Sequence, residues 1–317
     1  MIVGVSPAIR RALVLAERYA RTRLPVLLVG ATGTGKELFA QHIHERSGRP
    51  GPLVDVNCCA LPRDMVESLL FGHRRGAFTG AVEASVGHIE RSDRGTLFLD
   101  ELTSLAPEAQ GKLLRVLESG EVQALGAAVK RRVDLRVICA VQDDIWTALG
   151  RGPFRRDLFQ RVAGVVIELP PLAARPEDII PLAEHFADVQ GRRLERRVEG
   201  VLLNYGWPGN VRELRMAIER AGQLVEDGTL PPWAVAEAIA LGGPGPSPSG
   251  AEGHLVSSLL TRDDLLAVLD RTEWDVERAA TALRVGRTTF FKRLRALGIS
   301  LRAKPKFTSS PEFTDLS

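Results

Sequence analysis

A glycine-rich turn between an apolar run and a helical pattern constrains the fold of this chain more than any other feature. The apolar run covers residues 24–29, residues 38–43 are typical of a helix, and the turn between them reads Gly30-Ala31-Thr32-Gly33-Thr34-Gly35-Lys36. Glycines let backbone N–H groups close around phosphates, and the amino end of a helix adds positive potential. The pattern therefore predicts a phosphate-binding loop after a buried strand. An unrelated glycine-rich turn is the alternative, which the flanking strand and helix disfavour.

Lys36 and the residue after it bear on what this loop binds. The lysine is expected to reach the β- and γ-phosphates of a nucleotide. Glu37 occupies the position at which a Ser or Thr normally gives a hydroxyl to Mg²⁺. We therefore expect residues 30–37 to contact ATP, and other oxygens or water to complete the shell of the Mg²⁺ ion.

A second apolar run, residues 95–99, ends in the adjacent acids Asp100 and Glu101. Neighbouring side chains on a strand point to opposite faces, so the two acids can divide the chemistry. We expect Asp100 to bind Mg²⁺ and Glu101 to activate a water in line with the γ-phosphate. The alternative is an acidic strand end whose carboxylates cap the following helix.

Strand-like segments alternate with helical stretches in the first half of the chain, at residues 24–29, 53–57, 96–100, 136–141 and 164–169. Such alternation predicts an α/β fold, a five-stranded parallel sheet with helices on both faces. Prolines end this pattern, helical periodicity follows, and a run of Gly, Pro and Ser then reads as a linker. The predicted division is an α/β unit at 1–170, a helical unit at 171–240, a linker at 241–256, a third unit at 257–300, and a disordered tail at 301–317.

Composition narrows the class of protein. The 317 residues suggest about two domains, and the 44% hydrophobic content is enough for a packed core. Its net charge of +3 leaves any nucleic-acid affinity to a local patch, and its three cysteines show neither disulfide nor zinc spacing. No apolar run approaches a membrane span and no signal peptide is recognisable, so we expect a cytoplasmic protein with no membrane partner.

The third unit carries a local basic patch. Apolar residues at 276, 279, 280 and 283 share one helix face, Asp275 is placed to cap that helix, residues 284–286 form a turn, and another helix begins at Arg287. Two short helices about a glycine-containing turn predict a helix-turn-helix. Seven Lys and Arg between residues 284 and 304, without any Asp or Glu, favour double-stranded DNA over a merely solvated helix. Phe290, Leu294 and Leu297 are expected in the core, and the residues expected on DNA are Arg287, Thr288, Thr289, Lys292 and Arg293.

An insertion that an ordinary nucleotidase does not need lies between the phosphate loop and the acidic strand. It reads Gly76-Ala77-Phe78-Thr79-Gly80-Ala81. Its small residues allow a mobile hairpin-like tip, while Phe78 offers an apolar anchor and Thr79 a hydroxyl. These residues indicate a tip that an ATP-driven machine presses against a protein partner.

With these motifs the chain, from about Ser6 to Ile299, resembles the bacterial enhancer-binding proteins, the AAA+ activators of sigma-54 RNA polymerase. The resemblance implies an AAA+ ATPase with a helical lid and a Fis-type helix-turn-helix. It implies that residues 76–81 engage the sigma-54 holoenzyme, that upstream DNA is bound, and that the chain assembles into a homo-oligomer, a hexamer in the family. ATP and Mg²⁺ are the implied cofactors.

The resemblance also assigns roles to single residues. Residues 154–161 resemble the arginine-finger stretch, which puts Arg155 and Arg161 at the γ-phosphate of a neighbouring subunit. Residues 207–214 resemble the second sensor, with Arg212 reporting the phosphate state. Asn57 matches the asparagine that holds the catalytic glutamate in an unproductive position. From the residues alone, a surface ion pair for the arginines and a simple turn for Asn57 remain open.

The chain departs from the family pattern at several positions. Val141-Gln142 stands where a Thr-Asn pair is usual in the first sensor, so that hydrogen bond is either lost or remade by the longer amide. Ala31 and Arg74 replace acids, and Ala173-Ala174 interrupts a charged stretch. Met1 lies a few residues before the ATPase pattern, which predicts no receiver or sensing domain and control in trans or through expression.

Three hypotheses follow from the sequence. The first is an activator that binds upstream DNA and uses ATP hydrolysis to remodel the closed promoter complex. The second is a DNA-bound regulator whose nucleotide site governs assembly without remodelling polymerase. The third is an AAA+ motor acting on an unrelated protein client, with the last unit as an adaptor.

Overall fold

The computed structural model describes residues 2–142, 145, 149, 154–242, 260–283 and 285–299, apart from the side chain of Thr288. The chain divides into two compact units, Met1–Leu182 with Gly209–Leu214, and Ala183–Pro208 with Arg215–Ser317. Most of the predicted linker and all of the predicted tail lie outside the described residues. The predicted domain boundaries therefore stay predictions.

The first unit is built on a five-stranded sheet in the order β2-β3-β6-β1-β7, with every pair parallel. This confirms the predicted fold class and all five predicted strands. The bounds are β1 Val26–Val29, β2 Leu53–Asn57, β3 Thr96–Asp100, β6 Arg136–Val141 and β7 Val165–Glu168. Strands β1, β3 and β6 are buried almost throughout, as expected for central strands covered on both faces.

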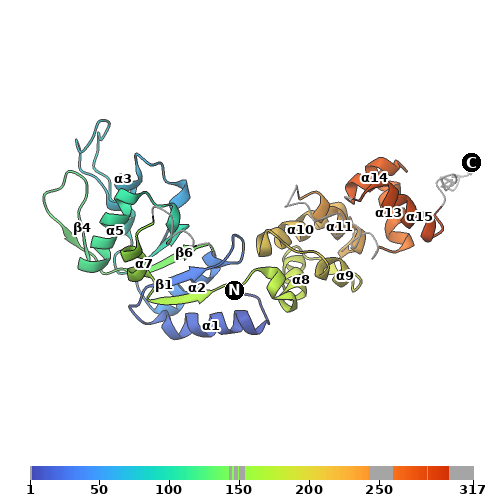
Figure 1. Ribbon diagram of the computed structural model, residues 1–317, viewed down its shortest axis with the longest axis horizontal. Coiled ribbons are helices and arrows are strands. Elements are labelled where there is room, and N and C mark those ends of the chain that lie inside the picture. Colours follow the sequence, from blue (N-terminus) through green and yellow to red (C-terminus); the bar gives the residue numbers. More distant parts are fainter. Residues whose placement is uncertain are drawn as a thin grey trace, which may run out of the picture. The chain divides into compact units, whose positions relative to one another are not determined.

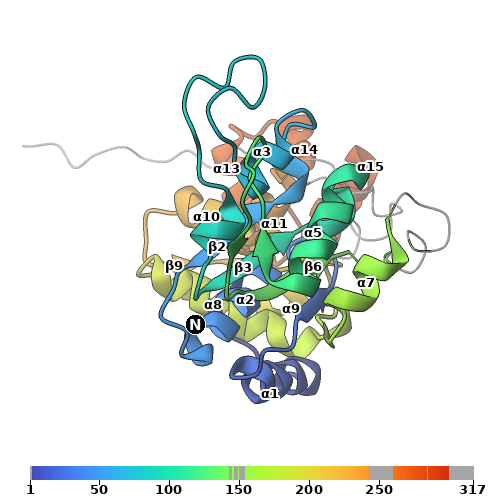
Figure 2. The ribbon, with the colours of Figure 1, turned by 90° about the vertical axis from the view of Figure 1, so that its left-hand side faces the viewer.

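Helices cover both faces of this sheet (Figure 1). Alternate strand residues belong to the two different cores on these faces. On one face α1 (Pro7–Ala20) and α2 (Lys36–Ser47) pack over Leu28, Phe98 and Ile138. On the other face Leu27, Leu97 and Cys139 meet the helices α3 (Val66–Phe71), α5 (Pro107–Ser119) and α7 (Arg156–Val162). Helices α5 and α7 also pack against one another (Figure 2).

Short elements connect these layers. They are η1 (Cys58–Ala60), α4 (His88–Arg91), η2 (Leu102–Ser104), the antiparallel pair β4 (Glu121–Val122) and β5 (Arg131–Arg132), η3 (Leu172–Ala174) and η4 (Pro176–Asp178). The α3–α4 and β4–β5 connections extend away from the sheet (Figures 1 and 2).

The helical pattern predicted after residue 177 is confirmed. It comprises α8 (Ile179–Val189), α9 (Val198–Leu203), α10 (Asn210–Leu224) and α11 (Pro232–Ala240), with a two-stranded pair of β8 (Arg193–Leu194) and β9 (Thr229–Leu230). Trp207 is 1% exposed and its indole N–H donates to the carbonyl of Leu202 at 2.9 Å, which satisfies its one polar atom in the core of the second unit.

Three further helices belong to the second unit: α13 (Arg262–Arg271), α14 (Val276–Ala282) and α15 (Arg287–Ala296). The predicted cap is confirmed, since the Asp275 carboxylate accepts the N–H groups of Glu277 at 2.9 Å and Arg278 at 3.1 Å. The predicted start of the last helix at Arg287 is also confirmed. Helix α13 packs on α11, where Arg271 pairs with Glu237 at 2.8 Å.

None of the helices in the described residues is both long enough and apolar enough to cross a membrane.

Candidate nucleotide site

The phosphate loop has the geometry that its sequence predicts. It leaves β1 after Val29, and α2 begins at Lys36 directly after Gly35. Gly33 and Gly35 have φ of 81° and 107°, a left-handed region that favours glycine. A Cβ at Gly33 would lie 2.4 Å from the carbonyl oxygen of Gly209, so this glycine also permits close backbone packing. The left-handed backbone explains glycine at both positions, and the close packing is a second reason for glycine at Gly33.

Lys36 is buried, with 7% of its surface exposed. Its Nζ donates to the carbonyls of Gly30 at 2.7 Å and Ala31 at 3.3 Å, both within the loop. No carboxylate pairs with this ammonium in the described part of the chain. A buried cation that is held only by neutral carbonyls is poorly compensated, and an anion entering the loop would supply the missing charge.

The two acids at the end of β3 do not share a strand, contrary to our expectation. The strand ends at Asp100, and Glu101 has φ of 52°, in the left-handed region. The Asp100 carboxylate accepts the N–H of Glu101 at 3.0 Å, which stabilises this turn. The prediction that adjacent strand positions send the acids to opposite faces was therefore wrong in its geometry, because the backbone changes direction between them.

Glu101 is held by an amide that follows the neighbouring strand β6. Gln142 Nε2 donates to Glu101 Oε2 at 3.0 Å. The longer side chain at this departure from the family pattern thus makes a hydrogen bond to the glutamate. Because parallel strands end at the same edge of a sheet, β6 brings Gln142 beside the end of β3.

Asn57 makes a different contact from the one that the resemblance implies. Its Oδ1 accepts the N–H of Cys59 at 2.9 Å and caps the short helix η1. No hydrogen bond joins Asn57 to Glu101 among the described residues, although Asn57 lies opposite Asp100 in the register of β2 and β3. In this structure Asn57 is a turn residue, as the simpler interpretation held.

Acids gather at this edge of the sheet. Burial raises the pKa of the Asp55 carboxyl, and the charges of Glu37 and Asp100 raise it further. Asp55 lies close enough to these acids to feel their charges, and the sequence did not reveal this, because an acid within a strand carries no motif. Among the described residues no three metal-ligating side chains come together. Mg²⁺ usually keeps several waters and binds one or two carboxylates together with substrate phosphates, so the single carboxylate of Asp100 at the end of β3 fits this ion.

Both arginines predicted to contact a neighbouring subunit belong to α7, because Arg155 is its N-cap and Arg161 lies in its last turn. Arg155 makes a bidentate pair with Asp157, with distances of 3.0 and 2.7 Å. This pair lowers the pKa of Asp157 to about 2, chiefly through the hydrogen bond from Arg155. Arg161 donates to the carbonyl of Leu117 at 2.6 Å through Nη2. Arg212 is exposed and makes no hydrogen bond or ion pair within the described residues.

Residues 76–81 form a closed hairpin tip. The N–H of Gly76 donates to the carbonyl of Ala81 at 2.8 Å, and Gly76 and Gly80 have positive φ of 77° and 96°. Phe78 is 43% exposed, and its ring meets that of His73 edge to face at 5.0 Å. The β4–β5 connection braces the base of the hairpin, since Arg74 N–H donates to the carbonyl of Leu125 at 2.9 Å.

The residues predicted to contact DNA lie on α15 with mixed surroundings. Phe290 and Leu294 are buried as predicted, and Leu297 is half-buried. Lys292 is exposed and Thr289 half-buried, while the side chain of Thr288 lies outside the description. The guanidinium groups are engaged elsewhere: Arg287 pairs with Glu277 at 2.5 Å, and Arg293 donates to the carbonyl of Leu260 at 2.9 Å. The predicted turn residue Arg284 lies outside the described residues.

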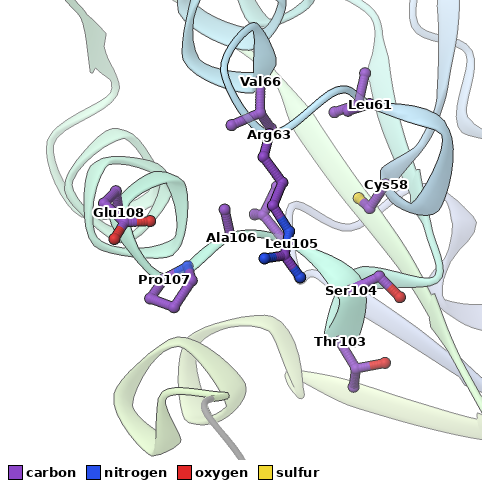
Figure 3. Close-up of a pocket in the computed structure, with 10 residues that line it drawn as sticks. All are labelled: Cys58, Leu61, Arg63, Val66, Thr103, Ser104, Leu105, Ala106, Pro107 and Glu108. Atoms are coloured by element: carbon purple, nitrogen blue, oxygen red, sulfur yellow. The ribbon is translucent and has the colours of Figure 1, made fainter.

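A separate cavity of about 670 Å³ lies beside the acidic edge of the sheet (Figure 3). Its lining comes from the segments that follow β2 and β3, with Cys58 and Arg63 from the first, and Ser104 and Glu108 from the second. Burial, with smaller contributions from nearby acids, raises the pKa of the Cys58 thiol to about 12, so this cysteine is a poor nucleophile. The cavity contains none of the phosphate-loop residues.

Comparison with protein families gives two matches. The sigma-54 interaction domain matches residues 2–168, and the AAA+ ATPase lid domain matches residues 173–248. Together they cover the sheet, the hairpin tip and the helices α8 to α11, but not α13, α14 or α15.

Individual relatives are similar over most of this chain. A Nif-specific regulatory protein from Azotobacter vinelandii is 38% identical over 315 residues, which are 95% of this chain and 60% of that protein. The DNA-binding transcriptional activator HyfR from Escherichia coli is 40% identical over 323 residues, 95% of this chain and 48% of HyfR. This chain thus spans about half to three fifths of these relatives.

Among solved structures, NtrX from Brucella abortus in complex with ATP superposes with a TM-score of 0.70 at 30% identity. The superposition covers 94% of this chain and 70% of the NtrX chain. The likeness extends from the α/β sheet into the helical region.

Proposed function

The chain belongs to the sigma-54 interaction domain family, and we propose that it is an ATP-hydrolysing transcriptional activator that remodels sigma-54 RNA polymerase. The same assignment makes its α/β unit an AAA+ ATPase with a lid. Curated relatives are named as transcriptional regulators and activators, and a similar solved structure holds ATP.

One observation carries the proposal. The ammonium of Lys36 is buried in a glycine loop with carbonyls as its hydrogen-bond acceptors and without an acidic partner in the described residues. A polyphosphate chain supplies the missing negative charge and accepts the N–H groups of the loop. In this proposal residues 30–37 bind the phosphates of ATP, with Arg212 as the sensor of their state.

Glu101 is the proposed base for the attacking water, and Asp100 the proposed Mg²⁺ ligand. Mg²⁺, when bound with ATP, neutralises charge on the phosphate oxygens. Gln142 fixes the Glu101 carboxylate at 3.0 Å. We propose that this bond, rather than one from Asn57, keeps the base away from water until the γ-phosphate is in place.

Arg155 and Arg161 are the proposed arginine fingers of an oligomeric ring, a hexamer by family resemblance. Both side chains now bond within their own chain, to Asp157 and to the Leu117 carbonyl. Bonds at an exposed surface are exchanged easily, so a neighbouring nucleotide can compete for these guanidinium groups. A guanidinium supplied in trans is worth about 10³–10⁵ in rate in characterised phosphoryl transfer.

The hairpin tip 76–81 is the proposed contact with the sigma-54 holoenzyme. Its exposed Phe78 and Thr79 offer an apolar face and a hydroxyl. Upstream double-stranded DNA is the proposed partner of α15, with the exposed Lys292 as the first phosphate contact and Arg287 available once its pair with Glu277 opens. Arg293 contributes only if its bond to Leu260 is exchanged.

ATPase activity measured against protein concentration tests the nucleotide part of this proposal. A site completed by a neighbour predicts a rate per subunit that rises with concentration until assembly is complete. Glu101→Gln should lower kcat by about 10²–10⁴-fold while ATP still binds. A rate per subunit that stays flat across the assembly range would reject the shared site, and binding without hydrolysis or remodelling would favour the nucleotide-governed DNA-bound regulator.

A further inference from the structure

Three consecutive carbonyls on the phosphate loop accept hydrogen bonds from residues far along the chain. Asn210 Nδ2 donates to the carbonyl of Thr32 at 3.0 Å, the N–H of Val211 to that of Gly33 at 3.0 Å, and Arg175 Nη2 to that of Thr34 at 3.0 Å. All of these residues belong to the first unit. We call Arg175, Asn210 and Val211 the carbonyl clamp.

The clamp determines where the loop N–H groups point. In a trans peptide the carbonyl and the following N–H point in opposite directions, and the structure contains no cis peptide among the described residues. Fixing the carbonyls of residues 32–34 therefore turns the N–H groups of Gly33, Thr34 and Gly35 toward the other side of the loop. That is the side on which phosphates bind in a loop of this kind.

The clamp side chains are themselves fixed. Asn210 is 3% exposed, has φ of 55°, and accepts the N–H of Leu172 at 2.7 Å through Oδ1. Arg175 is 3% exposed, and its Nη1 lies 3.6 Å from Oδ2 of the fully buried Asp178. The Asp178 carboxylate in turn accepts the N–H groups of Val5 at 2.6 Å and Ser6 at 2.7 Å. Each clamp side chain thus uses one polar group to anchor itself and another to hold the loop.

We propose that Asn210 and Arg175 are positioning residues that preorganise the phosphate loop and so set the affinity for nucleotide phosphates. The proposal rests on the nucleotide-binding function proposed above, and adds residues that touch the loop rather than the ligand. A loop that is already ordered loses less conformational freedom when the phosphates bind. Removing a clamp bond should then weaken binding while the catalytic acids remain in place.

Asn210→Gly isolates the side chain, because glycine accepts φ of 55° without strain. With the full chain, well below its unfolding temperature, we expect ADP binding by calorimetry to weaken about tenfold, the size of one lost hydrogen bond to a buried group. The KM for ATP should rise by a similar factor, with kcat changed less than about threefold. Arg175→Lys, which keeps the charge beside Asp178, should show the same direction.

Matched controls separate this role from a general loss of stability. Asn204 Nδ2 donates to the carbonyl of Gly200 and Arg220 Nε to that of Ala238, both in the second unit. Asn204→Gly and Arg220→Lys should leave ADP affinity within about twofold. Thermal unfolding without nucleotide reports any purely structural damage.

The outcomes are distinguishable. If wild type binds ADP and both clamp variants bind it equally well, the clamp is overturned while the proposed function stands. The clamp is likewise overturned if its variants lower only the unfolding temperature, or lower kcat without raising KM. If wild type binds neither ADP nor ATP, the proposed function and the clamp fall together.

Discussion

Two glycine-rich turns in this protein use the same residue for different purposes. In the phosphate loop, a Cβ at Gly30 would lie 2.6 Å from the Leu169 carbonyl oxygen, and one at Gly33 would lie 2.4 Å from that of Gly209. In the hairpin tip, a Cβ at Gly76 or Gly80 would meet nothing within 4 Å. The phosphate loop is packed against other segments at Gly30 and Gly33, although Gly35 has open space, whereas both glycines of the hairpin tip have open space around them.

This difference suits the proposed division of labour. A phosphate site gains affinity when its donors are fixed in advance. A tip that engages a partner gains from exposure, and Phe78 is 43% exposed. Four substitutions test the difference between the two turns and their surroundings.

The largest effect is expected when a methyl group is added to a tightly packed glycine of the phosphate loop. Gly33→Ala brings a methyl group against the Gly209 carbonyl at a φ of 81°, so the loop must shift. Overpacking and the left-handed conformation together cost about 2–5 kcal/mol, and ADP affinity should fall about a hundredfold. Gly80→Ala is the control, with a φ of 96° but open space, and should leave ADP affinity unchanged. Equal losses in both variants would show that the two turns do not differ in this way.

The second-largest effect is expected when one hydroxyl is removed from the hairpin tip. Thr79→Ala should reduce sigma-54-dependent open complexes at least tenfold, because the exposed hydroxyl is proposed to contact the sigma factor. ATPase activity should stay within about twofold, since Thr79 lies outside the phosphate loop. Ser85→Ala removes another exposed hydroxyl from the same α3–α4 connection, beyond the hairpin tip, and serves as control. Full remodelling activity in Thr79→Ala would move the contact elsewhere.

A smaller effect is expected at Gln142. If its amide keeps Glu101 from water, Gln142→Ala should raise the basal ATPase rate about threefold, within the range of one exposed hydrogen bond. Asn57→Ala should not raise the rate, because Asn57 bonds to the Cys59 N–H instead. A rise in Asn57→Ala and none in Gln142→Ala would restore the assignment that the family resemblance implies.

The smallest effect is a change in unfolding temperature, expected when one of the acids near the phosphate loop is replaced. The pKa of Asp55 is higher in the folded protein than in the unfolded chain. Ionisation of this carboxyl therefore lowers the stability of the fold as the pH rises from the ordinary pKa of an aspartate through the raised pKa. Asp55→Asn should therefore raise the unfolding temperature by about 1–2 °C at pH 7 and leave it unchanged below about pH 3.5. Asp188→Asn, on the exposed surface of α8, is the control. The account of the acidic edge is wrong if the difference is as large at low pH.

Much of the fold could be predicted from local patterns. The strands begin and end within two residues of the predicted bounds, because buried parallel strands are continuous apolar runs. The Asp275 cap and the start of α15 were predicted from residue types at fixed offsets. Such signals depend on neighbours in the chain, and they persist whatever the tertiary structure does.

The finer contacts of the site could not be predicted in this way. Asn210 and Thr32 are 178 positions apart, and Arg175 and Thr34 are 141 apart, so no local pattern joins them. A left-handed φ is uncommon for a glutamate, so residue type did not predict the turn at Glu101, and the strand rule failed there. The bond from Gln142 required a side-chain conformation that sequence alone leaves open.

In the proposed mechanism, hydrolysis of ATP at the phosphate loop drives the hairpin tip against polymerase. Open-complex formation by sigma-54 holoenzyme, compared with ATP and with a non-hydrolysable analogue, tests it most directly. The account predicts open complexes with ATP alone, and none when residues 76–81 are deleted. Equal promoter opening with the analogue, or by the protein that lacks the hairpin tip, would contradict it.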